Sequence, residues 1–468
     1  MEHGRVWRCL GVVTLLLLSS GEATAFWGAK IPRQGEAGWR TDGTGRYPDA
    51  TPPTTWSTSR NVIWKRALQN WSNATPVLHK GRIFVCEEPS TLVCIDQKSG
   101  EELWRAVVPY EELSALTDSG GRGELVARQR QLQAAINDLS GRLQAKPGDQ
   151  DLDRELGAAR SELNGVLAEI QRLNNAARQT GLPPTHDTNG YSSPTPVAGG
   201  ERVFVIFGTG AAAAFDLKGS RQWARIVGRP THGWGHSASP LLVDGKLIVH
   251  FDRTVYALDP ATGAELWTAA SASSWGTPAA MSAGDRWAVL TTGGDLIRCS
   301  DGRVVANNIG SMPWTSPLVE KGVIYIVDQN GASAYTVPGK LDDTVSLEKR
   351  WSAAVPADRY YASPVVHEGL LYAMTQSGSM SVLDTATGAV VYQKQLSLGG
   401  TTYPSFCVAG GRIFASADTG TTIVLEPGRA YLEVAVNTFE PFRSTPVFSG
   451  SRIYIRGLQN LYCLGTPE

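Results

Sequence analysis

The 468-residue chain lacks the sequence signals of several common classes of functional protein. It has no clustered run of Lys and Arg, and its 43 basic and 44 acidic residues give a formal net charge of -1. Nucleic-acid binding needs a basic footprint, so we expect no nucleic-acid partner. The chain also has no Cys-x-x-Cys-His segment for attached haem and no Gly-x-Ser-x-Gly nucleophile elbow. We therefore assign no catalytic residue.

Cysteine is scarce, with six residues in the whole chain. Five remain beyond the first 25 residues, an odd number and a low density for a scaffold held together by disulfides. Cys86 and Cys94 flank a seven-residue segment and have the spacing of a cross-strand pair. Buried free thiols are the preferred interpretation, because cysteines in strands commonly behave as small apolar residues.

Long hydrophobic runs are also missing. The apolar run from Leu10 to Leu18 follows Arg5 and Arg8 and precedes the small residues 23–25. About nine residues cannot cross a bilayer, which needs about 20 in a helix. We therefore predict a signal peptide over residues 1–25, cleaved after Ala25, and a secreted or periplasmic mature chain without a membrane span. An uncleaved anchor is the alternative.

Glycine and proline are plentiful, with 50 and 26 residues, and they punctuate a repeat. Eight copies of a pattern ending in Ser or Thr, usually followed by Pro, recur about every 40 residues, apart from one long gap. This spacing is typical of propeller blades. The copies begin at Trp71, Tyr191, His236, Trp275, Trp314, Tyr361, Tyr403 and Phe442.

The third copy reads as four short strands joined by tight turns. Strands are expected at 239–243, 247–251, 254–259 and 264–267, with Asp-Gly and Pro-Ala-Thr-Gly turns between them. Trp267 in the outer strand is expected to cover the neighbouring blade, as is Trp104 in the first copy. Four antiparallel strands of this kind make one propeller blade.

The two ends of the chain predict how the ring closes. The last copy, 442–464, has room for three strands, and the isolated strand sequence 61–65 carries Trp64 at the position of an outer-strand tryptophan. We therefore predict an all-β, eight-bladed propeller over 61–464, closed by this N-terminal strand, after a leader at 26–60. A seven-bladed ring is the alternative, because the fourth and seventh copies lack the outer tryptophan.

The long gap holds a helical pattern at 117–180, between blades 1 and 2. Leucines recur every seven residues at 125, 132 and 139, and again at 156 and 163 followed by Ile170, on either side of the Pro-Gly turn at 147–148. This pattern predicts an antiparallel helical hairpin of the coiled-coil type. The hairpin is either a solvated insertion or an arm that binds a partner.

The turn at 257–267, Ala-x-Asp-x-x-x-Gly-x-x-x-Trp, and the leader segment 39–45 resemble the pyrroloquinoline-quinone-like (PQQ-like) repeat propellers of exported bacterial proteins. The resemblance covers nearly all of 61–464 outside the hairpin. It implies one of two functions, because the family includes quinone-dependent dehydrogenases and non-enzymatic BamB-like propellers.

A set of aromatic residues provides the candidate ligand site. Each copy has one shortly before its Ser/Thr step, where the chain crosses from one blade to the next on one face of the ring. Such residues can form a funnel for a planar ligand, a peptide or a sugar, or they can simply wedge the blades together. Six have even offsets and could point the same way, unlike Trp234 and Phe442. The candidates are Trp71, Tyr191, Trp234, Trp275, Trp314, Tyr361, Tyr403 and Phe442.

Two further features lie in the same crossings. The hairpin emerges from one of them and is expected to form a wall or lid of the funnel. His232 and His236 lie in another, but the sequence identifies no third ligand, so we assign no metal site.

These observations predict an exported, non-enzymatic binding or scaffold protein of the cell envelope. Its partner would be an envelope protein or a small planar ligand at the aromatic mouth, with a possible contribution from the hairpin, and it would need no cofactor. The alternative is a dehydrogenase that uses pyrroloquinoline quinone with calcium or another divalent ion.

Overall fold

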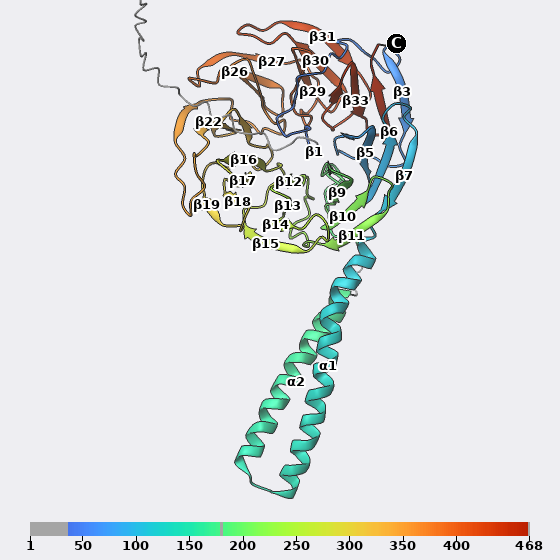
Figure 1. Cartoon of the computed structure of the whole chain (residues 1–468), viewed down its shortest axis with the longest axis vertical. Helices are drawn as coiled ribbons and strands as arrows, with labels where there is room; N and C mark the ends of the chain where they lie inside the picture. Colours follow the sequence, from blue (N-terminus) through green and yellow to red (C-terminus); the bar gives the residue numbers. More distant parts are fainter. Residues whose placement is uncertain (1–35, 178–180, 467–468) are drawn as a thin grey trace, which may run out of the picture.

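The computed structural model describes residues 36–177 and 181–466, so the predicted signal peptide lies outside the described residues. Eight sheets, each with four antiparallel blade strands, are arranged in a ring, as Figure 1 shows. The fourth repeat copy, which lacks the outer tryptophan, nevertheless forms a complete four-stranded sheet. The predicted eight-bladed propeller is therefore confirmed, and the seven-bladed alternative is wrong.

Each blade runs from an inner strand beside the channel to an outer strand at the rim. Blades 1 and 2 contain β4 (Val77–His79), β5 (Arg82–Glu87), β6 (Thr91–Asp96), β7 (Glu102–Val107), β8 (Val197–Gly199), β9 (Arg202–Ile206), β10 (Ala211–Asp216) and β11 (Arg221–Ile226). Blades 3 and 4 contain β12 (Leu241–Val243), β13 (Lys246–Phe251), β14 (Thr254–Leu258), β15 (Glu265–Ala270), β16 (Ala279–Ala283), β17 (Arg286–Leu290), β18 (Leu296–Arg298) and β19 (Val304–Ala306).

The second half of the ring repeats this order. Blades 5 and 6 contain β20 (Leu318–Glu320), β21 (Val323–Asp328), β22 (Gly331–Thr336), β23 (Lys349–Ala353), β24 (Val365–His367), β25 (Leu370–Met374), β26 (Ser379–Asp384) and β27 (Val390–Gln395). Blades 7 and 8 contain β28 (Cys407–Ala409), β29 (Arg412–Ser416), β30 (Thr421–Leu425), β31 (Glu433–Thr438), β32 (Val447–Ser449), β33 (Arg452–Arg456), β34 (Asn460–Leu464) and the N-terminal β3 (Val62–Ala67).

The ring closes through β3, which pairs with β34 and places Trp64 opposite Cys463. This is the predicted closure by the N-terminal strand, and it removes an open sheet edge. The five cysteines of the described residues are buried free thiols. Cys86 lies opposite Leu92 and Cys94 opposite Phe84, so the two do not form a cross-strand pair.

The Ser/Thr step of the repeat forms a closed ring of hydrogen bonds around the channel. In every blade the backbone N–H of this residue donates to the side-chain hydroxyl of its counterpart in the next blade, at 2.9–3.1 Å, and the eighth blade donates back to the first. Because the next residue is usually Pro, this N–H is the last donor before the inner strand. We call this set the hydroxyl ring: Thr75, Thr195, Ser239, Thr277, Ser316, Ser363, Ser405 and Thr445.

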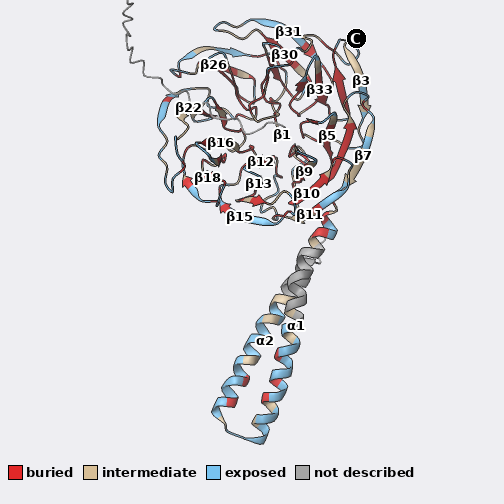
Figure 2. Ribbon diagram, viewed as in Figure 1, coloured by how far each residue is buried: buried red, intermediate tan, exposed pale blue. Residues whose placement is uncertain are grey.

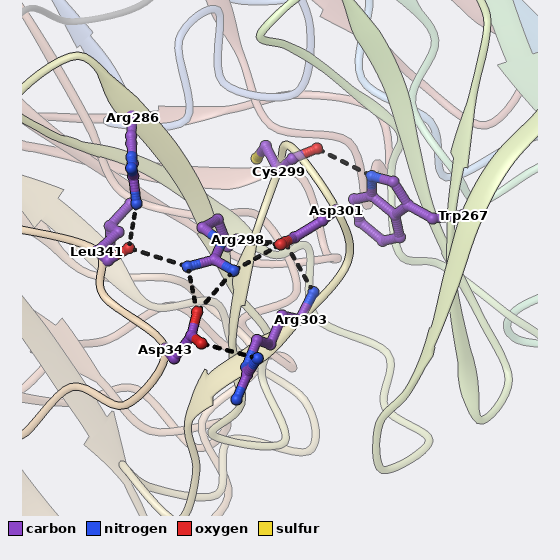
Figure 3. Close-up of polar contacts among 8 residues, drawn as sticks. All are labelled: Trp267, Arg286, Arg298, Cys299, Asp301, Arg303, Leu341 and Asp343. Atoms are coloured by element: carbon purple, nitrogen blue, oxygen red, sulfur yellow. Dashed lines mark hydrogen bonds and ion pairs between the residues drawn. The ribbon is translucent and has the colours of Figure 1, made fainter.

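Tryptophans of the outer strands join neighbouring blades, as predicted. Trp267 lies flat against Gly302 of the next blade, where a Cβ would come within 2.6 Å of the indole, and its N–H donates to the carbonyl of Cys299 at 2.9 Å (Figure 3). Gly302 also has a φ of +74°, which favours glycine. The same contact recurs at Trp64, Trp104, Trp223 and Trp351.

The boundary between blades 4 and 5 uses charge in place of tryptophan. Arg298, which is 7 % exposed, pairs with Asp301 of its own blade and with Asp343 of the next. It also donates to the carbonyl of Leu341 at 3.2 Å (Figure 3). This network joins the two blades where the outer strand β19 lacks the aromatic residue.

The leader fills one end of the channel. Its strand β1 (Glu36–Ala37) adds to the inner edge of blade 2, and β2 (Arg46–Tyr47) adds in parallel to blade 7. Between them Arg40 is fully buried and donates to the carbonyls of Pro364 and Phe406 at 2.8 and 2.9 Å. The channel is therefore closed from one side by the chain itself.

The helical insertion is an antiparallel pair, α1 (Tyr110–Ala145) and α2 (Gln150–Ala177). An apolar seam of Ile136, Leu139, Leu152 and Leu156 holds the helices together, while most of their described surface is exposed (Figure 2). The insertion starts at Tyr110, earlier than the expected residue 117, because its first turn packs into the core between blades 1 and 2 and has no heptad signal.

Candidate functional site

A cavity of roughly 570 Å³ opens at the face where the blades are connected to one another. The hydroxyl ring surrounds its lower part, and Trp39 from the leader is part of its lining. The leader fills the channel behind Trp39, so the cavity is open at one end and closed at the other. We call this cavity the cup.

A second ring of eight residues, one from each blade, lines the cup above the hydroxyl ring. Each member stands two residues before its hydroxyl residue, so both belong to the set of alternating side chains that point the same way in extended chain. Blades 4 to 7 contribute aromatic side chains, and the other four blades contribute polar ones. We call this set the mouth ring: Asn73, Ser193, Ser237, Trp275, Trp314, Tyr361, Tyr403 and Arg443.

Five of the eight aromatic residues singled out from the sequence line the cup. Four of them, Trp275, Trp314, Tyr361 and Tyr403, belong to the mouth ring. The fifth is Trp234, which reaches the cup from a crossing loop despite its odd offset and is 60 % exposed. Whether these five bind a ligand stays a prediction.

The other three aromatic residues do not line the cup. Phe442 is fully buried in the core of blade 8. The Tyr191 hydroxyl donates to the carbonyl of Pro183 at 2.6 Å, and Trp71 packs against Gly190. Trp71 and Tyr191 precede their hydroxyl residues by four positions, and Asn73 and Ser193 occupy the lining position instead. The even offset was therefore too loose a criterion, because the offset of two lines the cup in every blade, whereas the offset of four does not do so at Trp71 or Tyr191.

Two arginines that the sequence analysis missed lie at the cup, each over an aromatic ring. The Arg359 guanidinium lies 5.0 Å from the ring of Trp314, and that of Arg443 lies 5.7 Å from the ring of Tyr403. Arg359 also donates to the Tyr361 hydroxyl at 3.4 Å, and this hydrogen bond raises the pKa of Arg359. The guanidinium of Arg359 therefore stays protonated at the mouth of the cup, where it can interact with aromatic rings.

No Asp or Glu lines the cup within the described part of the chain. Calcium prefers several carboxylate and carbonyl oxygens as ligands, and hydride abstraction needs a base beside the cofactor. The residues present do not fit a quinone held with calcium. They form a positively charged, aromatic and hydroxyl-rich surface instead.

A group of two histidines and a carboxylate lies beside the cup. The sequence offered His232 and His236 without a third ligand, and the structure adds Asp252. Burial lowers the pKa of His236 to about 4, so this imidazole is neutral at pH 7. Asp252 was missed because it lies sixteen positions further along the chain, in the turn after β13.

The helical hairpin does not cover the cup. Figure 1, in which the ring is seen face-on, shows α1 and α2 extending outward from its rim, in line with the plane of the ring. The expectation that the hairpin forms a wall or lid of the funnel is therefore wrong. Its possible role as a partner-binding arm stays a prediction.

The fold and the cup define a class: an eight-bladed propeller whose channel is closed behind a cavity on one face. The family model described as outer membrane protein assembly factor BamB matches residues 32–251 and 251–405, well over half of the chain. The chain belongs to this family of PQQ-like repeat propellers.

Solved structures with low sequence identity share the fold. BamB from Moraxella catarrhalis is 9 % identical with a TM-score of 0.55, and the match covers 87 % of this chain and 98 % of that one. A europium-containing methanol dehydrogenase is 10 % identical with a TM-score of 0.54, covering 90 % of this chain and 96 % of that one. No curated protein matches the chain. Among the described residues, no helix combines the length and apolar character needed to span a bilayer.

Proposed function

We propose that this protein is an exported, non-enzymatic binding propeller of the cell envelope, and that its cup binds an acidic, aromatic segment of a partner protein. The observation that carries the proposal is the composition of the cup. It combines two arginines and six tryptophan or tyrosine side chains, Trp39 included, with no carboxylate among the described residues.

The chemistry of the cup favours an anionic ligand with a flat apolar part. Guanidinium groups make charge-assisted hydrogen bonds to carboxylates, and aromatic surfaces accept planar side chains. Tyr361 and Tyr403 stack on each other at 5.0 Å and lie between the two arginines. One ligand segment can therefore contact both charges and the aromatic half of the mouth ring.

Family membership supports a protein partner over a small metabolite. The matching family is described as an outer membrane protein assembly factor, and the M. catarrhalis BamB structure shares the fold. The proposal includes a location in the periplasm or outside the cell, which the family description and the predicted signal peptide support. In this proposal the hairpin is a second, separate contact surface at the rim.

The experiment uses the mature chain, residues 26–468, and two capped tetrapeptides. One alternates aspartate and phenylalanine, and the other replaces each aspartate by asparagine. We expect the acidic peptide to bind at least about tenfold more tightly by isothermal titration calorimetry, equivalent to about 1.4 kcal/mol. Equal affinities, or no measurable heat for either peptide, would contradict the proposal.

A quinone-dependent dehydrogenase is the competing function. Pyrroloquinoline quinone is planar and anionic, so some binding to the cup would agree with either function. The discriminating quantity is calcium dependence of the melting temperature in the presence of the quinone, because a ligand specific for the folded state raises stability. We expect no calcium-dependent rise. A clear rise would favour the enzyme and require a search for its base.

A further inference from the structure

His232, His236 and Asp252 lie together beside the cup. The two histidines come from the entry loop of blade 3, and the aspartate comes from a turn within that blade. The two histidines flank Trp234 in the crossing between β11 and β12, and Asp252 lies in the turn between β13 and β14. One ligating atom from each residue lies within 4.8 Å of the other two. His232 Nε2 and Asp252 Oδ1 are 3.9 Å apart.

Two of these side chains are buried with polar atoms that have no hydrogen-bond partner. His236 is 2 % exposed and its Nε2 makes no hydrogen bond, and Asp252 is 7 % exposed and its Oδ1 accepts none. A buried polar atom without a hydrogen bond destabilises the folded chain, and more strongly when the group is charged. A cation held by this group would give buried polar atoms of both side chains a partner.

We propose that His232, His236 and Asp252 bind a divalent first-row transition-metal ion of the zinc type. Imidazole nitrogen and carboxylate oxygen are ordinary zinc ligands, at about 2.0–2.2 Å from the ion. Tetrahedral ligands at that distance lie about 3.3–3.6 Å from each other, so the present group, spread over at most 4.8 Å, needs to contract by little more than 1 Å. Three protein ligands leave the fourth position open for water or for an atom of a bound partner.

Metal binding would change the contacts of His232. Its Nε2 now lies 3.2 Å from the Ser273 hydroxyl, and its Nδ1 accepts the backbone N–H of Trp234 at 3.3 Å. An imidazole that binds metal through Nε2 carries its proton on Nδ1, so the Trp234 amide has to turn away. Metal binding would therefore shift the backbone of Trp234, a lining residue of the cup. This metal site is a second binding function, separate from the proposed peptide binding.

The test is calorimetric titration of the chelator-treated mature chain with Zn²⁺ alone. We expect one ion to bind per chain, and at least about a hundredfold weaker binding in the His236→Asn and Asp252→Asn variants. His232→Asn removes a half-buried ligand with little risk to the fold, so it keeps the test valid if a buried variant does not fold. It should lose affinity to a similar degree.

The matched control is His186→Asn, which changes another histidine at the cup, stacked on Trp234 at 5.3 Å but outside the group. Its zinc affinity should equal that of the unmodified chain. Absence of stoichiometric zinc binding by the unmodified chain would overturn the proposal. So would equal affinity in the unmodified chain and the folded His232→Asn variant. Neither outcome depends on whether the acidic peptide binds.

Discussion

The hydroxyl ring and the mouth ring lie two residues apart in every blade, yet they differ in chemistry. The hydroxyl ring is uniform and buried, and each member makes the same bond to the next blade. The mouth ring is aromatic in four blades and polar in the other four, and it lines a cavity. The hydroxyl ring thus keeps the same hydrogen bond in all eight blades, which stabilises the propeller. The mouth ring differs in side-chain type from blade to blade. We infer from this contrast that binding belongs to the mouth ring.

The largest expected effect is on the free energy of unfolding, and it distinguishes a tryptophan packed between blades from one at the cup. Trp351→Ala removes an indole that is 8 % exposed, packs on Gly388 and donates to the carbonyl of Thr385. Its loss should lower the free energy of unfolding by about 3–5 kcal/mol in urea denaturation. Trp234→Ala, at the cup and 60 % exposed, should change it by less than about 1 kcal/mol. Similar losses in both variants would remove the distinction between scaffold and mouth.

A smaller effect is expected within the hydroxyl ring itself. Thr277→Val deletes the hydroxyl that accepts the Ser239 N–H at 3.0 Å and leaves that buried donor unpaired. The free energy of unfolding should fall by about 1–3 kcal/mol. Thr277→Ser keeps the hydroxyl and serves as the control, with a loss of less than about 1 kcal/mol. If the serine variant is as unstable as the valine variant, the ring of hydrogen bonds contributes little.

The smallest effect on stability, but a clear one on binding, is expected in the mouth ring. Trp314→Ala removes a half-buried indole on which Arg359 lies. Affinity for the acidic peptide should fall about tenfold, since stacking and cation–π contacts contribute about 1 kcal/mol or more. The melting temperature should change little. Full affinity in this variant would place the ligand elsewhere.

The fold was predictable because the repeat carries it in the local sequence. Each Ser/Thr step marks the start of a blade, and each turn glycine marks a turn between strands. Trp64 marks the strand that closes the ring. Together these features predicted eight blades. The function of the Ser/Thr steps was missed, since a bond from one blade to the next is not visible within one copy. The apolar seam between the two helices was also predictable, because leucines recur every seven residues. The outward direction of the hairpin was not predictable, because it depends on how the first turn of α1 packs against the propeller.

The cup was only partly predictable, for two physical reasons. Arg443 stands at the lining position of its blade, but the aromatic residue of that copy is its neighbour Phe442, which is buried. Arg359 stands four residues before Ser363, a position that does not reach the cup at Trp71 or Tyr191, and Asp252 comes from the turn after β13. The tertiary fold decides that Arg359 lines the cup and that Asp252 lies beside it. The two-residue offset is the sequence signal that would have found the whole mouth ring.

The most direct test of the account is the affinity of the acidic peptide for the Arg359→Gln/Arg443→Gln double variant. The matched control is Arg202→Gln, at the start of β9 and absent from the cup lining. We predict that the double variant binds at least about tenfold more weakly, with an unchanged melting temperature, while the control binds like the unmodified chain. Unchanged affinity in the double variant would show that the cup is not the binding site.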